Sequence, residues 1–136
     1  MHVTILASCA VLIIMTLLLA FWTSFQRVQS DTIAFDTSVE PTSVMAKAKR
    51  AHGNAAEYSA LLIGLFLVVG FAYQGRDLGA FVTSAIIVVT AARVLHAIGI
   101  LTCATLERAH PLKAIGATVT YIGGVILAIM SLVRIF

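Results

Sequence analysis

Four long runs of apolar residues, separated by shorter polar segments, dominate the pattern along the chain. They cover about residues 3–24, 50–73, 78–101 and 112–134. Each run is close to the roughly 20 residues that an α-helix needs to cross a hydrocarbon core of about 30 Å. None of them alternates between apolar and polar positions over the roughly ten residues of a transmembrane β-strand. The pattern therefore predicts four membrane-spanning helices.

The polar connections predict how these helices are arranged. The second connection is a tight turn with two glycines, and Pro111 suits the first turn of the fourth helix, where a missing N–H group has no cost. Short connections make consecutive helices antiparallel neighbours. We therefore expect one all-α integral membrane domain over residues 1–136, an up-down-up-down four-helix bundle. The longer first connection, about residues 26–50, contains Thr42, Ser43 and the preceding pair Glu40–Pro41 as candidates for the start of the second helix.

The composition excludes a soluble domain. Of the 136 residues, 60% are hydrophobic and 11% are charged, against about half and a quarter in soluble proteins. The first apolar run has no basic segment before it and no A-x-A-like cleavage site after it, so we interpret it as a retained helix rather than a secretory signal. Cys9 and Cys103 lie far apart and predict neither a disulfide framework nor a metal site.

Lysine and arginine residues are unevenly divided between the two sides of the predicted membrane. The first and third connections contain Arg27, Lys47, Lys49, Arg50, Arg108 and Lys113. The opposite side has Arg76 and Arg134. The positive-inside rule then predicts that the first and third connections lie in the cytoplasm and that both termini lie outside it.

The second predicted helix carries a line of polar residues into its apolar run. Arg50, Asn54 and Glu57 are spaced at i, i+4 and i+7 and therefore lie within one sector of the helix. An unpaired charge at the depth of Glu57 costs up to about 2.5–3.5 kcal/mol on insertion scales, so this carboxylate needs a partner. Arg93 of the third helix is expected at a comparable depth. One interpretation is a structural Glu57–Arg93 ion pair, with Arg50 reaching the interface.

More polar groups gather at this end of the helices than one ion pair requires. The full set is Arg27, Arg50, His52, Asn54, Glu57, Tyr58, Arg93, His96, Arg108 and Lys113. Arginines bind carboxylates bidentately, a glutamate holds an ammonium group, and an asparagine hydrogen-bonds a peptide group. A small zwitterionic ligand with more than one carboxylate would use such a set, while an apolar substrate arrives through the bilayer.

The segment RAHGNAAEY, from Arg50 to Tyr58, resembles the second-helix signature of the MAPEG family, the membrane-associated proteins of eicosanoid and glutathione metabolism. The segment RVLHAIG, from Arg93 to Gly99, and the four-helix hydropathy extend the resemblance over essentially the whole chain. The resemblance implies a homotrimer that binds glutathione between subunits near the cytoplasmic face. In the enzymes of the family, the glutathione thiol attacks lipophilic electrophiles or reduces peroxides. It also implies a bacterial-type member in the inner membrane.

The resemblance assigns roles to individual residues. The implied glutathione ligands are Arg50, Asn54, Glu57, Tyr58, Arg93 and His96, with Arg27 and His52 near a terminal carboxylate. Arg108 or Lys113 would stabilise the thiolate, because a nearby cation lowers a thiol pKa from about 8.5 toward neutrality. Two positions depart from the family pattern: Ile100 stands where several enzymes have an aromatic residue, and Ala117 replaces a tyrosine.

These departures keep other functions open. A family member without efficient chemistry would act as a binding or scaffold protein. A small proton-coupled exporter would use Glu57, but the surrounding cations hold its proton too weakly for coupling near neutral pH. No nucleic-acid partner is expected. In the fourth helix, Thr120, Gly124 and Ala128 form a small-residue stripe that serves either a contact within the bundle or a seam between subunits.

Overall fold

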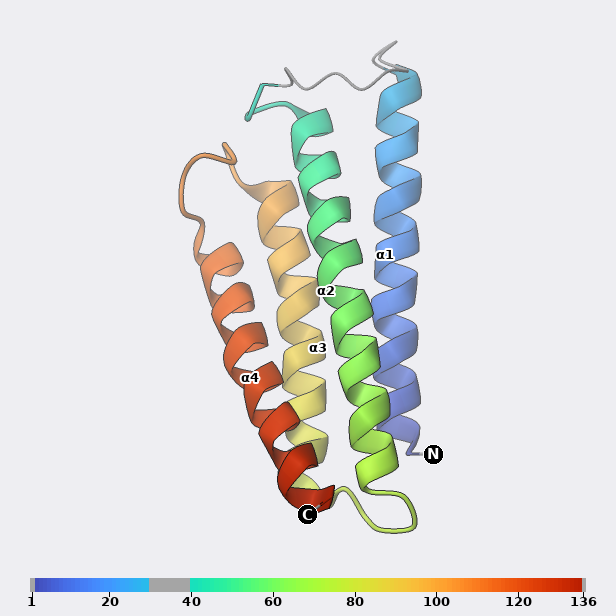
Figure 1. Cartoon of the computed structure of the whole chain (residues 1–136). Coiled ribbons are helices and arrows are strands. Elements are labelled where there is room, and N and C mark those ends of the chain that lie inside the picture. The colour runs from blue at the N-terminus through green and yellow to red at the C-terminus, as the bar shows by residue number, and fades with distance from the viewer. Residues whose placement is uncertain (1, 30–39, 136) are drawn as a thin grey trace.

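The computed structural model describes residues 2–29 and 40–135, and four long helices make up most of these residues. They are α1 (Val3–Gln29), α2 (Val44–Ala72), α3 (Gly79–Thr102) and α4 (Pro111–Ile135). The helices lie side by side, and both chain ends are at the same end of the bundle (Figure 1). Each helix is long and apolar enough to cross a membrane. The predicted all-α fold of an integral membrane protein is therefore confirmed.

Helix α2 begins about two turns earlier than its apolar run suggested. Ser43 is its N-cap, and the Ser43 hydroxyl oxygen accepts a hydrogen bond from the Ala46 N–H group at 3.1 Å. A serine at this position satisfies one of the N–H groups that the first turn of a helix leaves unpaired. Arg50 therefore lies within the helix and not at its start. The Leu106 N–H group donates to the Pro41 carbonyl oxygen at 3.1 Å and ties the third connection to the start of α2.

The buried core changes along the bundle. One cluster contains a large apolar side chain from each helix: Leu12, Phe66, Ile86 and Leu127. A second cluster lies nearer to the end where α1 and α3 finish and α2 and α4 begin, which we call the basic end. It joins α1, α2 and α3 through Leu19, Ala51, Ala55, Ala97 and Ile100. Alanines at this level allow the helix backbones to approach closely. At this end, Arg93 and His96 of α3 make their polar contacts with α2 and α4 respectively.

Helices α3 and α4 approach so closely that glycines are required at their contact. A Cβ atom added at Gly116 would lie 2.6 Å from the Ala92 carbonyl oxygen and 2.7 Å from the His96 Cβ atom. A Cβ atom added at Gly99 would lie 2.7 Å from the Lys113 backbone nitrogen. Ordinary contacts of a Cβ atom are longer than these distances. The two glycines therefore set the spacing of α3 and α4 at the level of His96.

The small-residue stripe of α4 does not make this contact. Its residues are four positions apart, and each such step turns the helix surface by about 40°. Thr120 is therefore buried, Gly124 is half-buried and Ala128 is exposed, as the stripe passes from α3 toward a groove beside α2. Within the chain, Gly116 makes the close contact with α3 instead. A seam between subunits along the stripe stays a prediction.

Replacing Gly116 with alanine is expected to lower the stability of the bundle. The added methyl group collides with the backbone of α3, so the two helices must separate, at a cost of about 1–3 kcal/mol. Thermal unfolding in detergent, followed by circular dichroism, measures this effect. Gly64→Ala is the matched control, because a Cβ atom at Gly64 meets nothing within 4 Å. Equal melting temperatures for the two variants would contradict the close contact.

Candidate functional site

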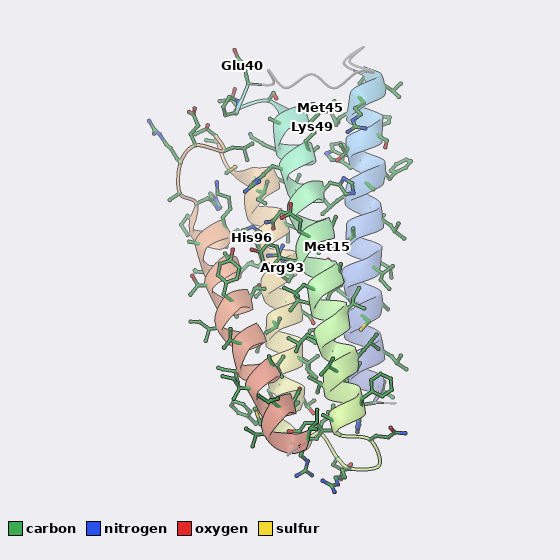
Figure 2. The ribbon with its side chains drawn as sticks, in the orientation of Figure 1. Met15, Glu40, Met45, Lys49, Arg93 and His96 are labelled. Carbon is green, nitrogen blue, oxygen red and sulfur yellow. The ribbon has the colours of Figure 1, made fainter. Side chains whose placement is uncertain are left out.

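Arg93 is the central charged group of the candidate site. Its side chain extends from α3 and is only 1% exposed. The Nη2 atom donates hydrogen bonds to the Asn54 side-chain oxygen at 2.5 Å and to the Asn54 carbonyl oxygen at 3.4 Å. The guanidinium carbon lies 4.6 Å from the centroid of the Tyr58 ring, within range of a cation–π interaction. Figure 2 labels Arg93 together with His96, which lies one turn nearer to the basic end on α3.

Only one of the three guanidinium nitrogen atoms of Arg93 forms hydrogen bonds with the described residues. The Nε and Nη1 atoms have no hydrogen-bond partner among the described residues. A guanidinium group has five N–H donors, and a buried one normally uses most of them. Because an arginine can only donate, the side-chain oxygen of Asn54 must face it, and the amide NH₂ group of Asn54 is turned the other way. The buried cation thus fixes the orientation of a polar side chain on α2.

The expected Glu57–Arg93 ion pair is not formed. Glu57 is exposed, whereas Arg93 is buried against Asn54 and Tyr58. On α2, the Glu57 position is rotated by about 60° from Asn54 and by about 100° from Tyr58, so it lies outside the sector that faces Arg93. Arg50 is also exposed, on the same side of α2 as Asn54. The interpretation of the polar residues as one structural ion pair is therefore wrong, and two opposite charges remain at the surface.

Two further predicted ligands, His52 and Arg27, differ from Arg50 in their positions. His52 is half-buried and about 200° around α2 from Arg50, which places it on nearly the opposite side of the helix. Arg27 is exposed in the last turn of α1. The Thr23 hydroxyl donates to the Ala48 carbonyl oxygen at 3.1 Å, so Arg27, one turn further, is about level with the start of α2. Within one chain, His52 therefore faces away from Arg50, and Arg27 lies near the level at which α2 starts.

His96 connects α3 to the start of α4. Its Nδ1 atom lies 2.7 Å from the Lys113 carbonyl oxygen. Because a carbonyl oxygen only accepts hydrogen bonds, Nδ1 carries a proton, and the neutral form of the ring then has its lone pair on Nε2. The missing side chain of Gly116 leaves room for His96, since a Cβ atom at Gly116 would collide with the His96 backbone. The half-buried ring is thus held in one orientation with one nitrogen available to accept.

The two candidate cations of the third connection have different surroundings. The Lys113 Nζ atom donates to the carbonyl oxygens of Arg108 at 3.0 Å and Leu106 at 3.4 Å, so its ammonium group closes the loop. The side chain of Arg108 is exposed. An ammonium group that already binds two carbonyl groups has less donor capacity for a further anion. The geometry therefore favours Arg108 over Lys113 as a cation for a ligand.

The two departures from the family pattern have structural counterparts. Ile100 is 3% exposed and packs in the core with Ala55, so its side chain is used for packing between helices. Ala117 brings no hydroxyl group, but Tyr121 stands one turn further along α4. The Tyr58 hydroxyl donates to the Tyr121 hydroxyl at 3.1 Å, and the ring centroids are 5.6 Å apart. The contact with Tyr58 therefore adds Tyr121, which is not among the predicted residues, to the candidate site.

Sequence reasoning missed Tyr121, although a signal was available. Tyrosines of membrane proteins concentrate at the two membrane interfaces, where the hydroxyl group reaches water. Tyr121 instead follows Pro111 by about 15 Å of helix rise, deep in an apolar run. A tyrosine hydroxyl in an apolar run needs a hydrogen-bond partner. Tyr121 also lies four residues after Ala117, so the two positions are on the same side of α4.

Comparison with known protein families identifies one family. The model of the MAPEG family matches residues 5–133, which is nearly the whole chain. No curated protein and no solved structure matches the chain. The family is associated with the use of glutathione, and its match spans the four helices that carry the polar group. The chain therefore belongs to the MAPEG family.

Proposed function

We propose that the protein binds glutathione and activates its thiol toward lipophilic electrophiles or hydroperoxides, as a membrane transferase or peroxidase. The observation that carries the proposal is the contact of buried Arg93 with Asn54 and Tyr58. It fixes an amide group on α2 while Arg50 and Glu57 remain exposed beside it. A purely structural network would pair these charges within the subunit. A cation, an anion and a fixed amide at one surface are the groups that a peptide with charged ends requires.

Each of these groups has its own task toward the bound tripeptide. Arg50 offers a guanidinium fork to a carboxylate. Glu57 accepts hydrogen bonds from the ammonium group, and the NH₂ group of Asn54 donates to a peptide carbonyl oxygen. The lone pair on His96 Nε2 accepts one further N–H or S–H donor. These residues therefore bind and orient glutathione, and Arg93 acts on it through Asn54.

The site is complete only in an assembly, which we propose to be a homotrimer. His52 lies on nearly the opposite side of α2 from Arg50, so we propose that a neighbouring subunit supplies its own His52, together with its Arg27, to the same ligand. The basic end then faces the cytoplasm of a bacterial cell, with both termini on the far side of the inner membrane. Glutathione enters from the cytoplasm, and the lipophilic substrate enters from the bilayer.

Glutathione supplies the reactive sulfur, and the task of the protein is to favour its ionised form. A cation close to the sulfur lowers the pKa of a thiol from about 8.5 toward neutrality. We assign this task to Arg108, because the ammonium group of Lys113 already holds two loop carbonyl groups. Lys113 then positions the loop that carries Arg108.

A binding or scaffold protein that keeps the ligand but lacks efficient chemistry is the second candidate function. Ala117 favours it, because this position offers no hydroxyl group to the site, and buried Ile100 offers no aromatic ring. Saturable glutathione binding without thiolate formation would identify this function. A proton-coupled exporter is less well supported, because the exposed Glu57 carboxylate shares its side of α2 with the cation of Arg50.

The recognition of the ammonium group by Glu57 is tested with a pair of ligands. Glu57→Gln is expected to weaken glutathione binding about tenfold, because it removes a charge-assisted hydrogen bond. The same substitution is expected to leave the affinity for an analogue without the amino group nearly unchanged, which a calorimetric double-mutant cycle measures. Lys47→Ala, which removes a charge nearly three turns earlier on α2, is the control. Equal losses for both ligands would mean that Glu57 does not bind the ammonium group.

A further inference from the structure

A polar pocket lies at the end of the bundle opposite to the basic end. It has a volume of about 470 Å³, within the range of about 300–1,000 Å³ that is typical of ligand pockets. Figure 1 shows the turn between α2 and α3 at this end of the bundle, together with both chain ends. Among the described residues, the pocket is lined by His2, Gly70, Gln74, Gly75, Arg76 and Asp77. It is therefore separate from the candidate site around Arg93.

The local fold holds this pocket together through backbone groups. Gly75 has a φ angle of 74°, a left-handed conformation that glycine adopts without strain, and it ends α2. The Arg76 N–H group then donates to the Tyr73 carbonyl oxygen at 3.1 Å and closes the turn. The same carbonyl oxygen lies 3.4 Å from the His2 Nε2 atom, which holds the start of α1 against the end of α2. These contacts leave the side chains of the turn for other partners.

Two opposite charges line the pocket without being paired. Arg76 and Asp77 are both exposed, and no ion pair or side-chain hydrogen bond joins either of them to another residue within 2–29 and 40–135. A guanidinium group binds a phosphate through parallel N–H groups, and a carboxylate accepts hydrogen bonds from an ammonium group. Gln74 adds an exposed amide that both donates and accepts. The pocket therefore suits a ligand that carries a phosphate and an ammonium group.

An apolar groove continues from the polar pocket along α2. It has a volume of about 230 Å³ and is lined by Leu67, Gly70, Phe71 and Gln74. Gly70 and Gln74 line both the pocket and the groove. Gly70 has no side chain to separate the two, and a Cβ atom added there would lie 3.3 Å from the Ile5 Cδ1 atom of α1. A polar head and an apolar chain of one ligand can therefore bind next to each other.

The direction of the groove matches the direction of a membrane lipid. A turn between two membrane-spanning helices lies at a membrane surface, where lipid headgroups meet water. Leu67 and Phe71 precede Gln74 on α2, so the groove runs from the turn back along the spanning helix. The polar pocket is thus on the headgroup side, and the groove extends toward the acyl chains.

We propose that this pocket and groove bind a phospholipid whose headgroup contains a phosphate and a primary ammonium group, as in phosphatidylethanolamine. Arg76 binds the phosphate, Asp77 binds the ammonium group, and the groove holds part of one acyl chain. The lipid contacts α1, α2 and the turn, so its binding stabilises the folded bundle. The proposal does not depend on glutathione binding, which involves the other end of the bundle.

Other occupants use only part of this surface. A soluble phosphate compound leaves the groove empty, and a lipid with phosphate alone leaves Asp77 unpaired. A second copy of the chain would offer its exposed large side chains, which are mostly leucine, isoleucine, valine and phenylalanine, to the groove and leave both charges without partners. The combination of two charges with an adjoining groove therefore favours a zwitterionic lipid.

The test measures lipid binding to the purified protein in detergent by native mass spectrometry. The parent protein is expected to bind phosphatidylethanolamine saturably and about tenfold more tightly than phosphatidylcholine with the same acyl chains, because the methylated ammonium group has no N–H donor for Asp77. Asp77→Asn is expected to reduce this preference to within about twofold. Arg76→Gln is expected to weaken the binding of both lipids about tenfold. Arg134→Gln, at the same end but outside the pocket lining, is the matched control.

Gly70→Leu tests the groove, because a side chain at this position fills the space between the pocket and the groove. Both lipids are expected to bind about tenfold more weakly to this variant, whereas Gly64→Leu, where a Cβ atom meets nothing within 4 Å, retains them. Arg76 and Asp77 are exposed, so their variants keep the test valid if Gly70→Leu does not fold.

Four results would overturn the proposal. The first is equal affinity of the parent protein for the two lipids, and the second is a preference that survives in Asp77→Asn. The third is binding of glycerophosphoethanolamine, which has no acyl chains, as tightly as the lipid, because the ligand would then be a soluble compound. The fourth is a changed oligomeric mass of Gly70→Leu, because the groove would then hold another copy of the chain.

Discussion

Replacing Arg93 with methionine is expected to weaken glutathione binding by about tenfold or more and to leave the bundle folded. Arg93 is too buried to bind a ligand at the surface, so its effect passes through Asn54 and Tyr58. Without the guanidinium group, the Asn54 amide loses the donor that fixes it. Methionine is flexible enough to fill the vacated space. The substitution removes a buried charge and leaves neutral groups behind, so the free energy of unfolding is expected to change by less than about 2 kcal/mol.

Two measurements on the Arg93→Met variant separate two roles of Arg93: orienting Asn54 for the ligand and stabilising the fold. Calorimetry gives the dissociation constant for glutathione, and thermal unfolding gives the stability. Arg134→Met is a suitable control, because this guanidinium group also lies over a tyrosine ring, 5.3 Å from the centroid of Tyr73, but at the other end of the bundle. Unchanged glutathione affinity would contradict the account. A large loss of stability would show that Arg93 serves the fold instead.

The second large effect is expected at Arg108. Replacing it with methionine removes the cation assigned to the sulfur, so the pKa of bound glutathione should return toward about 8.5 and the thiolate fraction at neutral pH should fall about tenfold. The affinity for glutathione is expected to stay within a few fold, because Arg50 and Glu57 hold the charged ends of the ligand. The ultraviolet absorbance of the thiolate, followed against pH, reports this change as a midpoint at higher pH.

Lys113→Met is the comparison for Arg108→Met. The Lys113 ammonium group binds the carbonyl oxygens of Leu106 and Arg108, so its loss is expected to loosen the third connection and increase cleavage there by a protease. The midpoint of thiolate formation is expected to move less than in Arg108→Met. If the midpoint moves in Lys113→Met and stays in place in Arg108→Met, the cation has been assigned to the wrong residue.

Hydropathy predicted the helices well because the membrane imposes their length and their internal hydrogen bonding. The apolar run alone does not reach the start of α2, since the first two turns of this helix contain Lys47 and Lys49. Ser43, one of the candidate start residues, is the N-cap because its side chain satisfies a free N–H group. Charged residues in the first turns of α2 therefore hid its boundary from hydropathy, whereas the N-cap residue indicated it.

The members of the polar group could be predicted from sequence, but their pairing could not. Helical spacing placed Arg50, Asn54 and Glu57 on one side of α2, and the structure keeps them there. The partner of Arg93 depends on a rotation of α2 by about 60°, which favours Asn54 over Glu57 and which sequence spacing does not specify. The same limit hid Gly116, because its role appears only when the distance between α3 and α4 is known.

The most direct test of the glutathione site is a titration of the purified protein with glutathione at neutral pH, followed by thiolate absorbance. The account predicts a signal that saturates in the parent protein and disappears in Arg50→Ala, while Lys47→Ala retains it. Absence of saturable binding in the parent protein, by absorbance and by calorimetry, would contradict the account and leave Arg50, Asn54 and Glu57 without a ligand.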